Sequence, residues 1–193
     1  MNGEEKVRPL RDEDIILQVR RGDINAYESI VKRYESSVAN IIYGILGNVS
    51  NAEDLGQEVF IRAFRGLSQF RFRAQFKTYL TRIAINVCRD ALRKNEVHVV
   101  PIQEQLLTAD QLVVDGQEEQ ELKEVVQQAL LQLDHDQRMV VVLRILEGYS
   151  TRETAGLLKV PQGTVLSRLS RGLERLRHIL EKEETIKPFI TRN

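Results

Sequence analysis

Apolar residues recur at intervals of three and four along most of this chain, which is the spacing of one face of an α-helix. No segment shows the period-two alternation of a half-buried strand, so the sequence predicts an all-α protein. Breaks at Gly22, Gly47 and Gly66 separate four predicted helices, the last running from about Phe76 to Leu92. Four helices within about 85 residues are enough for a compact bundle.

Short polar side chains mark where several helices are expected to begin. Asp23 is a good N-cap for the second helix, and residues 50–53 have the pattern of a capping box before the third. Residues 134–137 and 150–153 repeat this pattern in the second half of the chain. A last helix follows the turn at Pro161, and we expect its leucines, including Leu173, to face inward.

The periodicity weakens in an acidic stretch that divides the chain in two. Pro101 and Gly116 interrupt it, and we predict a flexible, mostly non-helical linker. Its apolar residues could dock in a groove on a partner. The expected organisation is two small helical domains with a linker and a tail, and the boundaries are 10–95, linker 96–116, 117–184 and tail 185–193.

Charge is distributed in blocks that the overall balance hides. Lys and Arg number 28, as do Asp and Glu, so the net charge is zero. Residues 62–94 nevertheless carry nine basic side chains against one acidic, and residues 138–177 carry eight against three. The stretch 96–136 between them has ten acidic side chains against one basic. Two basic blocks of this kind favour contact with phosphates despite the neutral sum.

Several classes of protein are excluded by what the sequence lacks. A single cysteine, Cys88, rules out an intramolecular disulfide and a cysteine-rich zinc site, and three scattered histidines give no metal-ligand spacing. We find no glycine-rich phosphate loop and no nucleophile–base pair, so we expect no enzyme, no metal and no cofactor. With no apolar run of about 18 residues and no signal-peptide core, we expect a cytoplasmic protein.

One segment alternates aromatic rings with cations, a mixture that a core alone does not require. Flat rings beside positive charges suit unpaired bases and their phosphates. Phe70 and Phe72 lie two apart, so no helix can bury both on one face. Some of these rings could equally be core, and Asn86 beyond them is as easily a surface residue as a base contact. The alternating residues are Phe70, Arg71, Phe72, Arg73, Phe76, Lys77 and Tyr79.

Two other segments are candidates for binding partners. Residues 151–177 fit a helix-turn-helix, whose second helix enters the major groove, although a plain helical hairpin with solvated arginines is the simpler alternative. Asp54, Gln57 and Glu58 lie on the third predicted helix, outside its apolar stripe. Complementing the helix dipole explains acids near a helix start, but explains Glu58 less well.

In this order, these residues resemble the bacterial sigma factors of the extracytoplasmic-function (ECF) group, from about Asp12 to Leu180. The resemblance rests on the joint pattern, since each piece is weak alone. Its parts are Gly22-Asp23 with Ala26-Tyr27, Ala52-Glu53-Asp54-Leu55 with Gln57-Glu58-Val59-Phe60, Phe70-Arg71 to Phe76, Tyr79-Leu80 with Arg82-Ile83-Ala84 and Asn86, and Gly163-Thr164-Val165 with Ser167-Arg168.

The resemblance implies a non-catalytic subunit that directs RNA polymerase to promoters. The polymerase core, with its beta and beta-prime subunits, would bind through Asp54, Gln57 and Glu58. The −10 element would be captured and melted by Phe70, Arg71, Phe72, Arg73, Phe76, Tyr79, Arg82 and Asn86. The −35 element would be contacted by Arg144, Thr164, Leu166, Ser167, Arg168, Ser170 and Arg171. The linker would thread toward the polymerase active site, and an anti-sigma factor would hold the protein inactive.

Departures from the family pattern refine this expectation. Leu166 and Ser170 stand where arginine and aromatic contacts are common, which predicts weak or unusual −35 reading and a helper protein that aids promoter targeting. Tyr79 replaces a more common Trp and keeps a stacking ring, whereas Thr81 replaces a common aromatic and thins one melting surface. A stand-alone helix-turn-helix regulator and a two-bundle adaptor are the alternatives, and neither needs the Phe/Arg segment.

Overall fold

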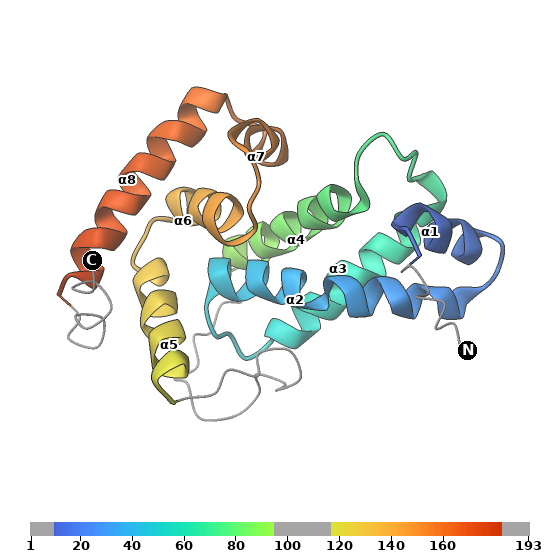
Figure 1. Cartoon of the computed structure of the whole chain (residues 1–193), viewed down its shortest axis with the longest axis horizontal. Coiled ribbons are helices and arrows are strands. Elements are labelled where there is room, and N and C mark those ends of the chain that lie inside the picture. Colours follow the sequence, from blue (N-terminus) through green and yellow to red (C-terminus); the bar gives the residue numbers. More distant parts are fainter. Residues whose placement is uncertain (1–9, 95–116, 183–193) are drawn as a thin grey trace, which may run out of the picture.

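The computed structural model describes residues 10–94 and 117–182, and every regular element in these two ranges is helical (Figure 1). The predicted all-α class is therefore confirmed. The predicted linker, 96–116, and the tail, 185–193, lie outside the described residues, so the proposed domain boundaries stay predictions. No helix in the described ranges is both long and apolar enough to cross a bilayer.

The N-terminal half is a bundle in which α2, α3 and α4 pack against one another. Its core is formed by apolar residues at helical spacing, with Ile30, Ile41 and Ile45 of α2 and Val59 of α3 almost fully buried. The elements of this half are α1 (Asp12–Arg20), η1 (Ile24–Ala26), α2 (Tyr27–Leu46), α3 (Ala52–Gly66), η2 (Leu67–Gln69) and α4 (Phe76–Arg93).

The starts of these helices match the sequence only in part. Asp23 does cap, but it accepts from the backbone of Ala26 and begins the short η1 turn that leads into α2. The capping box expected at residues 50–53 is wrong, because Asn51 is the N-cap of α3 and its side chain makes no capping bond. The backbone N–H of Ala52 donates to the carbonyl of Val49 at 3.0 Å, so one of the first donors is satisfied by the preceding turn.

The C-terminal half carries the predicted helix-turn-helix in its last two helices. Asp134 caps α6, and the capping box of Ser150 and Glu153 at the start of α7 is confirmed. The inward placement of Leu173 is wrong, because 40% of that residue is exposed, whereas Val165 and Leu176 are buried as predicted. The elements are α5 (Gln117–Leu131), α6 (His135–Val141), η3 (Val142–Leu146), α7 (Thr151–Leu158) and α8 (Gln162–Leu180).

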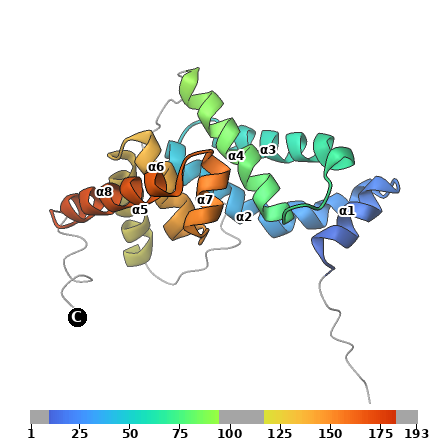
Figure 2. The ribbon, with the colours of Figure 1, turned by 90° about the horizontal axis from the view of Figure 1, so that it is seen from above.

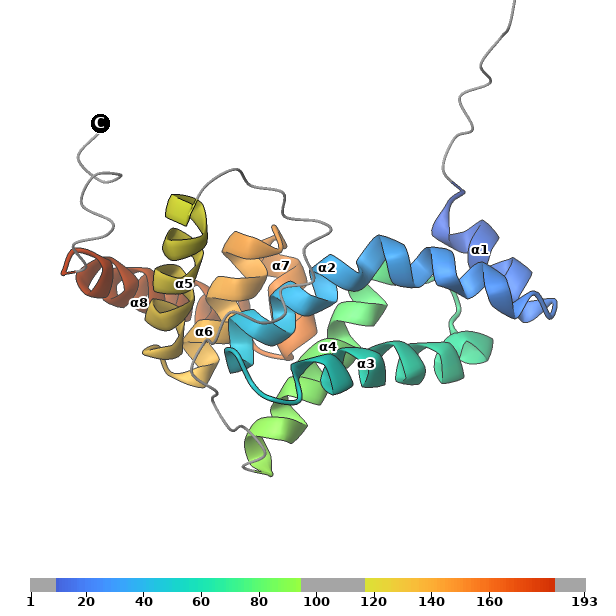
Figure 3. The same ribbon diagram turned by 90° about the horizontal axis from the view of Figure 1, so that it is seen from below.

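The two halves pack directly on each other, which the sequence did not predict. Helix α2 contacts α5, α6 and η3, and α4 contacts α7, so that one apolar core continues across the junction (Figures 2 and 3). Gly44 permits the close approach, because a Cβ there would lie 2.9 Å from a methyl carbon of Val142. A residue with a side chain would push η3 away from α2.

Polar contacts also cross this junction. The buried carboxylate of Glu147 accepts from Ser37 Oγ at 2.6 Å and pairs with Lys77 Nζ at 3.3 Å. On the next turn of α4, the hydroxyls of Thr81 and Tyr149 are hydrogen-bonded at 2.8 Å. Lys77 and Thr81 therefore define a face of α4 that is turned toward the C-terminal half.

Arg138 of α6 is a buried cation that joins the ends of α2 and α5 and the connection between α5 and α6. Its guanidinium donates to the carbonyls of Ile45 at 2.7 Å, Leu131 at 2.6 Å and Leu133 at 2.8 Å, and only 5% of the residue is exposed. The last carbonyls of a helix lack intrahelical donors, so these bonds satisfy groups that burial would otherwise leave unpaired. Burial also lowers the pKa of Arg138 from its ordinary value.

Candidate nucleic-acid interface

The loop between η2 and α4 brings together the four aromatic rings that the sequence singled out. Phe70 lies 5.1 Å from Phe72, 5.6 Å from Phe76 and 5.0 Å from Tyr79, measured between ring centroids. Phe70 and Phe76 are core residues, with 8% and 3% exposed, whereas Phe72 and Tyr79 remain partly open to solvent. The rings therefore form one cluster with a buried floor and an accessible rim.

A cavity of about 340 Å³ opens beside this cluster. Its size falls at the lower end of the range for small-molecule sites, roughly 300 to 1,000 Å³. We call it the loop cavity. Cations from the loop and from α4 lie around the two rings that line it. The full lining is Gly66, Gln69, Phe70, Arg71, Arg73, Ala74, Thr78, Tyr79 and Arg82.

Sequence reasoning missed four of the residues around this cavity: Gly66, Gln69, Ala74 and Thr78. From the sequence, Gly66 is expected only to end a helix. In the structure it lets the ring of Tyr79 cross the end of α3, because a Cβ at this position would lie 2.1 Å from Tyr79 Oη. Partial burial there raises the pKa of the Tyr79 hydroxyl, which keeps it a neutral hydrogen-bonding group.

A residue outside the candidate set holds the loop from behind. Arg20, at the end of α1, donates from Nε to the carbonyl of Leu67 at 2.9 Å, and its Nη2 bonds the carbonyls of Leu67 and Phe70. The guanidinium also lies over the ring of Phe72, 5.0 Å from its centroid. No motif in the sequence signalled this contact, because it joins residues about 50 positions apart.

The outer face of α4 continues from the cavity. Tyr79, Arg82 and Asn86 follow at helical spacing, and Arg82 and Asn86 are exposed. Thr81, expected to belong to a melting surface, is instead 2% exposed and bonded to Tyr149. Thr81 thus lies on the face toward the C-terminal half, where a larger aromatic side chain would have to displace Tyr149.

The acidic residues of α3 lie on its solvent side. Asp54 and Gln57 are exposed, and Glu58 is half-buried. Glu58 pairs with Arg62 one turn later at 2.6 Å, and Arg62 also reaches Asp90 of α4 at 3.4 Å. The carboxylate of Glu58 is therefore already paired with a cation of its own bundle.

The outer face of α8 presents an exposed stripe without a central cation. It consists of Leu166, which is 54% exposed, with Ser167, Ser170 and Arg171. Arg168 is drawn aside into an ion pair with Asp136 of α6, so its guanidinium does not join this stripe.

Two other predicted −35 residues are engaged inside the C-terminal half. Thr164 is half-buried, and its carbonyl accepts from Ser167 Oγ at 3.1 Å. Arg144 is also half-buried and donates to the carbonyl of Tyr149, just before α7. In this structure, Arg144 is therefore held beside the N-terminus of α7 and does not extend into solvent.

Nothing in the described residues suggests metal or redox chemistry. They contain no group of three or more His, Cys, Asp or Glu side chains placed to hold a metal ion. Cys88 is fully buried in α4, and burial raises the pKa of its thiol to about 12, so it stays protonated. The arrangement is suited to binding through rings, cations and hydrogen bonds.

Comparison with known proteins agrees with this arrangement. The family model "Sigma-70 region 2" matches residues 30–97, and "Sigma-70, region 4" matches residues 123–176. The chain is 37% identical to the ECF RNA polymerase sigma factor SigW of Bacillus subtilis, over 84% of this chain and 92% of the relative. It is 30% identical to the RNA polymerase sigma-H factor of Pseudomonas aeruginosa, over 89% and 94% of the two chains.

Solved structures share the fold. A structure of CnrH in complex with the cytosolic domain of CnrY superposes with a TM-score of 0.68 at 22% identity, covering 90% of this chain and 99% of that one. The sigma factor RpoE, in complex with the anti-sigma factor NepR from Bartonella quintana, gives 0.64 at 20% identity, covering 82% and 98%. By sequence and by fold, the chain belongs to the ECF group of sigma-70 family sigma factors.

Proposed function

We propose that this chain is the sigma subunit that directs bacterial RNA polymerase to a set of promoters, melting the −10 element and contacting the −35 element. The observation that carries the proposal is the loop cavity, walled by aromatic rings and arginines, on the same chain as a helix-turn-helix. Sigma factors are non-catalytic initiation factors, so binding energy must drive the melting. The stand-alone regulator is not favoured, because it leaves the cavity and the region 2 match without a role.

The loop cavity would capture one base extruded from the −10 element. Separating a duplex step costs about 1.4 kcal/mol on average. Stacking an extruded base on an aromatic ring returns about 1 to 3 kcal/mol. Phe70 and Tyr79 line the cavity, and Arg71, Arg73 and Arg82 around it would neutralise the neighbouring phosphates. The cavity therefore offsets the unstacking cost and can favour one base over others.

The remaining −10 residues divide between contact and support. Phe72, on the partly open rim, and Asn86, exposed further along α4, would meet the unpaired strand. Phe76 lies in the core beneath the cluster and would act by supporting Phe70 and Tyr79. The rings thus have separate tasks, set by their burial.

The acidic side of α3 would bind the polymerase core. Asp54, Gln57 and Glu58 would grip the clamp helices of the beta-prime subunit, with the beta subunit contacted elsewhere. Asp54 is the sharpest probe, because Glu58 already pairs with Arg62. We expect Asp54→Lys to weaken binding of purified core at least several-fold while leaving the unfolding temperature unchanged. Equal core binding by the variant and the natural protein would contradict this role.

The outer face of α8 would enter the major groove at the −35 element. Leu166 cannot hydrogen-bond a base but can contact a thymine methyl, and Ser167, Ser170 and Arg171 supply polar contacts. Arg168, Thr164 and Arg144 would support the helix or the DNA backbone beside it. A face with so few base-reading groups suits a helper protein that adds promoter affinity. A strong −35 footprint with polymerase alone would contradict the need for a helper.

An anti-sigma factor is the regulatory partner that we propose. Among the solved structures with this fold, the sigma factor RpoE is bound by the anti-sigma factor NepR, and CnrH is bound by the cytosolic domain of CnrY. The direct packing of the two halves in this chain supports the proposal, since a partner could hold them together and keep them from DNA and polymerase.

Reconstitution with purified core polymerase tests the proposed function. A sigma factor forms a stoichiometric complex with core, starts transcripts at defined 5′ ends on genomic fragments, and makes promoter thymines reactive to permanganate. A regulator would bind DNA without the stoichiometric core complex, and an adaptor would produce no permanganate signal. Absence of both the complex and the signal would overturn the proposal.

A further inference from the structure

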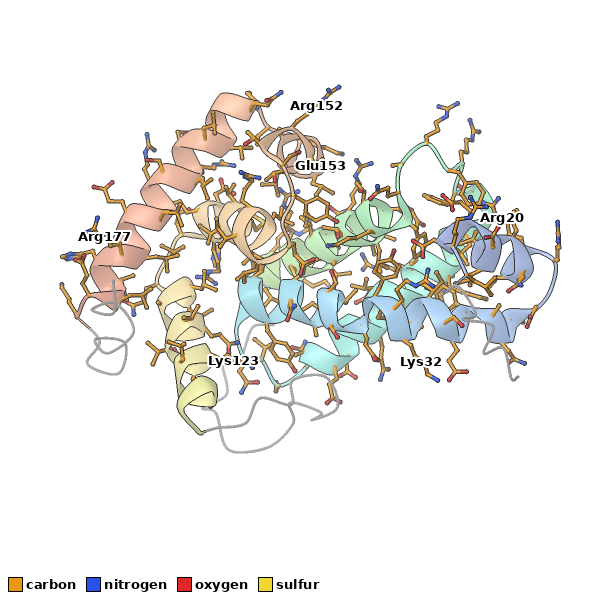
Figure 4. All side chains as sticks on the ribbon, viewed as in Figure 1. Arg20, Lys32, Lys123, Arg152, Glu153 and Arg177 are labelled. Atoms are coloured by element: carbon orange, nitrogen blue, oxygen red, sulfur yellow. The ribbon has the colours of Figure 1, made fainter. Side chains whose placement is uncertain are left out.

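Arg20 stands apart from the residues assigned so far. It lies on α1, before residue 30, where the match to the region 2 model begins, and it does not line the loop cavity. Its guanidinium nevertheless donates hydrogen bonds to two backbone carbonyls behind the cavity, those of Leu67 and Phe70. Figure 4 labels Arg20 where α1 meets the end of α3.

The two carbonyls that Arg20 binds are the ones that fix the loop. Leu67 is the first residue of η2, and Phe70 is the residue that ends it and turns the chain into extended backbone. The carbonyl of Leu67 already accepts from the backbone N–H of Phe70 within the turn, and Arg20 adds a further donor to it and a donor to the carbonyl of Phe70, so the short η2 turn is held in part from outside. By donating to both, Arg20 sets where the chain leaves η2 and hence where the ring of Phe70 lies.

The same guanidinium restrains the next ring of the cluster. Phe72 has a φ of 53°, in the left-handed region that a bulky side chain rarely adopts. The ring of Phe72 makes one contact with the guanidinium of Arg20 and a second, edge-on contact with the ring of Phe70. The surroundings therefore hold Phe72 in a backbone conformation that it would not favour alone.

We propose that Arg20 is a positioning residue that preorganises the loop cavity before DNA arrives, acting through Phe70 and Phe72 without touching the extruded base. The inference rests on the proposed function of the cavity. It also explains the residue type: a planar guanidinium can donate to two carbonyls while stacking on a ring, whereas a lysine ammonium cannot reproduce this geometry.

The test compares variants in holoenzyme on a promoter fragment taken from a mapped transcription start. The fragment is a fork junction with a single-stranded −10 element, in which each nucleotide in turn is replaced by an abasic site. The measured quantity is the ratio of affinities for the intact and the abasic fragment. In the natural protein we expect a ratio of about 5- to 150-fold at the captured position, the range of ring stacking.

Arg20→Ala and Arg20→Lys should both lower this ratio toward unity while retaining core binding. The matched control is Arg21→Ala, because Arg21 is an exposed neighbour that forms no side-chain bond with the described part of the chain, and its ratio should stay unchanged. Arg20→Lys keeps the charge and the aliphatic stem, so it decides the outcome if Arg20→Ala does not fold.

Two results would overturn these ideas, and they differ. An unchanged ratio in a folded Arg20 variant sinks the positioning role and leaves the function intact. Absence of any base-dependent position in the natural protein, which would leave every ratio near one, overturns the proposed capture itself. A loss of affinity that is equal for intact and abasic fragments leaves the ratio unchanged and belongs to the first result, because it shows only a general structural effect.

Discussion

The loop cavity and the outer face of α8, the two proposed DNA-binding sites, are built in opposite ways. The cavity is assembled from three elements, with a buried floor of Phe70 and Phe76 and a distant arginine bonded to its backbone. The face of α8 needs only one helix, and Leu166 and Ser170 on it project freely. A site that must extrude a base requires side chains that several elements hold in place beforehand. A site that contacts an intact groove requires only one rigid helix.

The largest expected effect is a difference in how much a side chain at each site contributes to the free energy of unfolding. Phe76→Ala removes a core ring under the cavity and should lower the free energy of unfolding by about 3 to 5 kcal/mol. Leu166→Ala on α8 should change it by no more than about 0.5 kcal/mol, because the side chain is exposed. Urea unfolding of both variants measures the contrast. A small loss for Phe76→Ala would show that its ring is not part of the core.

Two glycine substitutions compare how closely other atoms surround the backbone at the two sites. Gly66→Ala places a Cβ against Tyr79 Oη and should displace that ring, costing most of the roughly 1 to 3 kcal/mol of base stacking. Gly163→Ala in α8 meets no atom within 4 Å in the described structure, so −35 binding should hold and the helix gain up to about 1 kcal/mol. Permanganate reactivity and fork-junction affinity report the first change, and thermal unfolding the second. Normal promoter opening by Gly66→Ala would contradict the cavity model.

Adding a cation to α8 tests whether its outer face is as open as it appears. Leu166→Arg supplies a guanidinium that can bond guanine bidentately, and should create a preference for G·C at one −35 position worth about 1 to 3 kcal/mol. Selection of −35 sequences from a randomised library with holoenzyme would reveal it. An unchanged selected sequence would show that residue 166 does not reach the bases.

The smallest expected effect concerns two of the arginines of α8, Arg168 and Arg171. Arg171 makes no ion pair with the described part of the chain, so Arg171→Ala should reduce the salt dependence of promoter binding by about one phosphate contact. Arg168→Ala should reduce it less, because Asp136 already neutralises that side chain. Binding measured across a range of salt concentrations distinguishes the two. The opposite order would mean that DNA breaks the Arg168 ion pair.

Local features of the sequence were the most predictable. Helix periodicity, the capping box at Ser150 and the helix-turn-helix all depend on residues within a few positions of one another, and these elements are present as expected. The alternation of rings and cations points to the loop between η2 and α4, where the rings do cluster, and its role in DNA binding stays a prediction. The alternation could not show which rings are buried and which stay partly exposed, because burial depends on the helices packed around them.

Long-range contacts were invisible for a physical reason. Arg20 resembles any other surface arginine near a helix end, and only the fold brings it to carbonyls about 50 residues away. Thr81 looked like a position on the melting surface until its bond to Tyr149, 68 residues later, placed it at the junction of the halves. Such contacts have no sequence period, because they arise from how separate helices are placed.

The two faces of α4 have a consequence for how such proteins diversify. Tyr79, Arg82 and Asn86 project on one side, while Lys77 and Thr81 meet the C-terminal half on another. If the first side reads the −10 element as proposed, a duplicated gene can accumulate changes there and acquire a new promoter preference without disturbing the contact between the halves. The helix separates what evolution is free to vary from what it must keep, so paralogues can diverge in target while sharing one architecture.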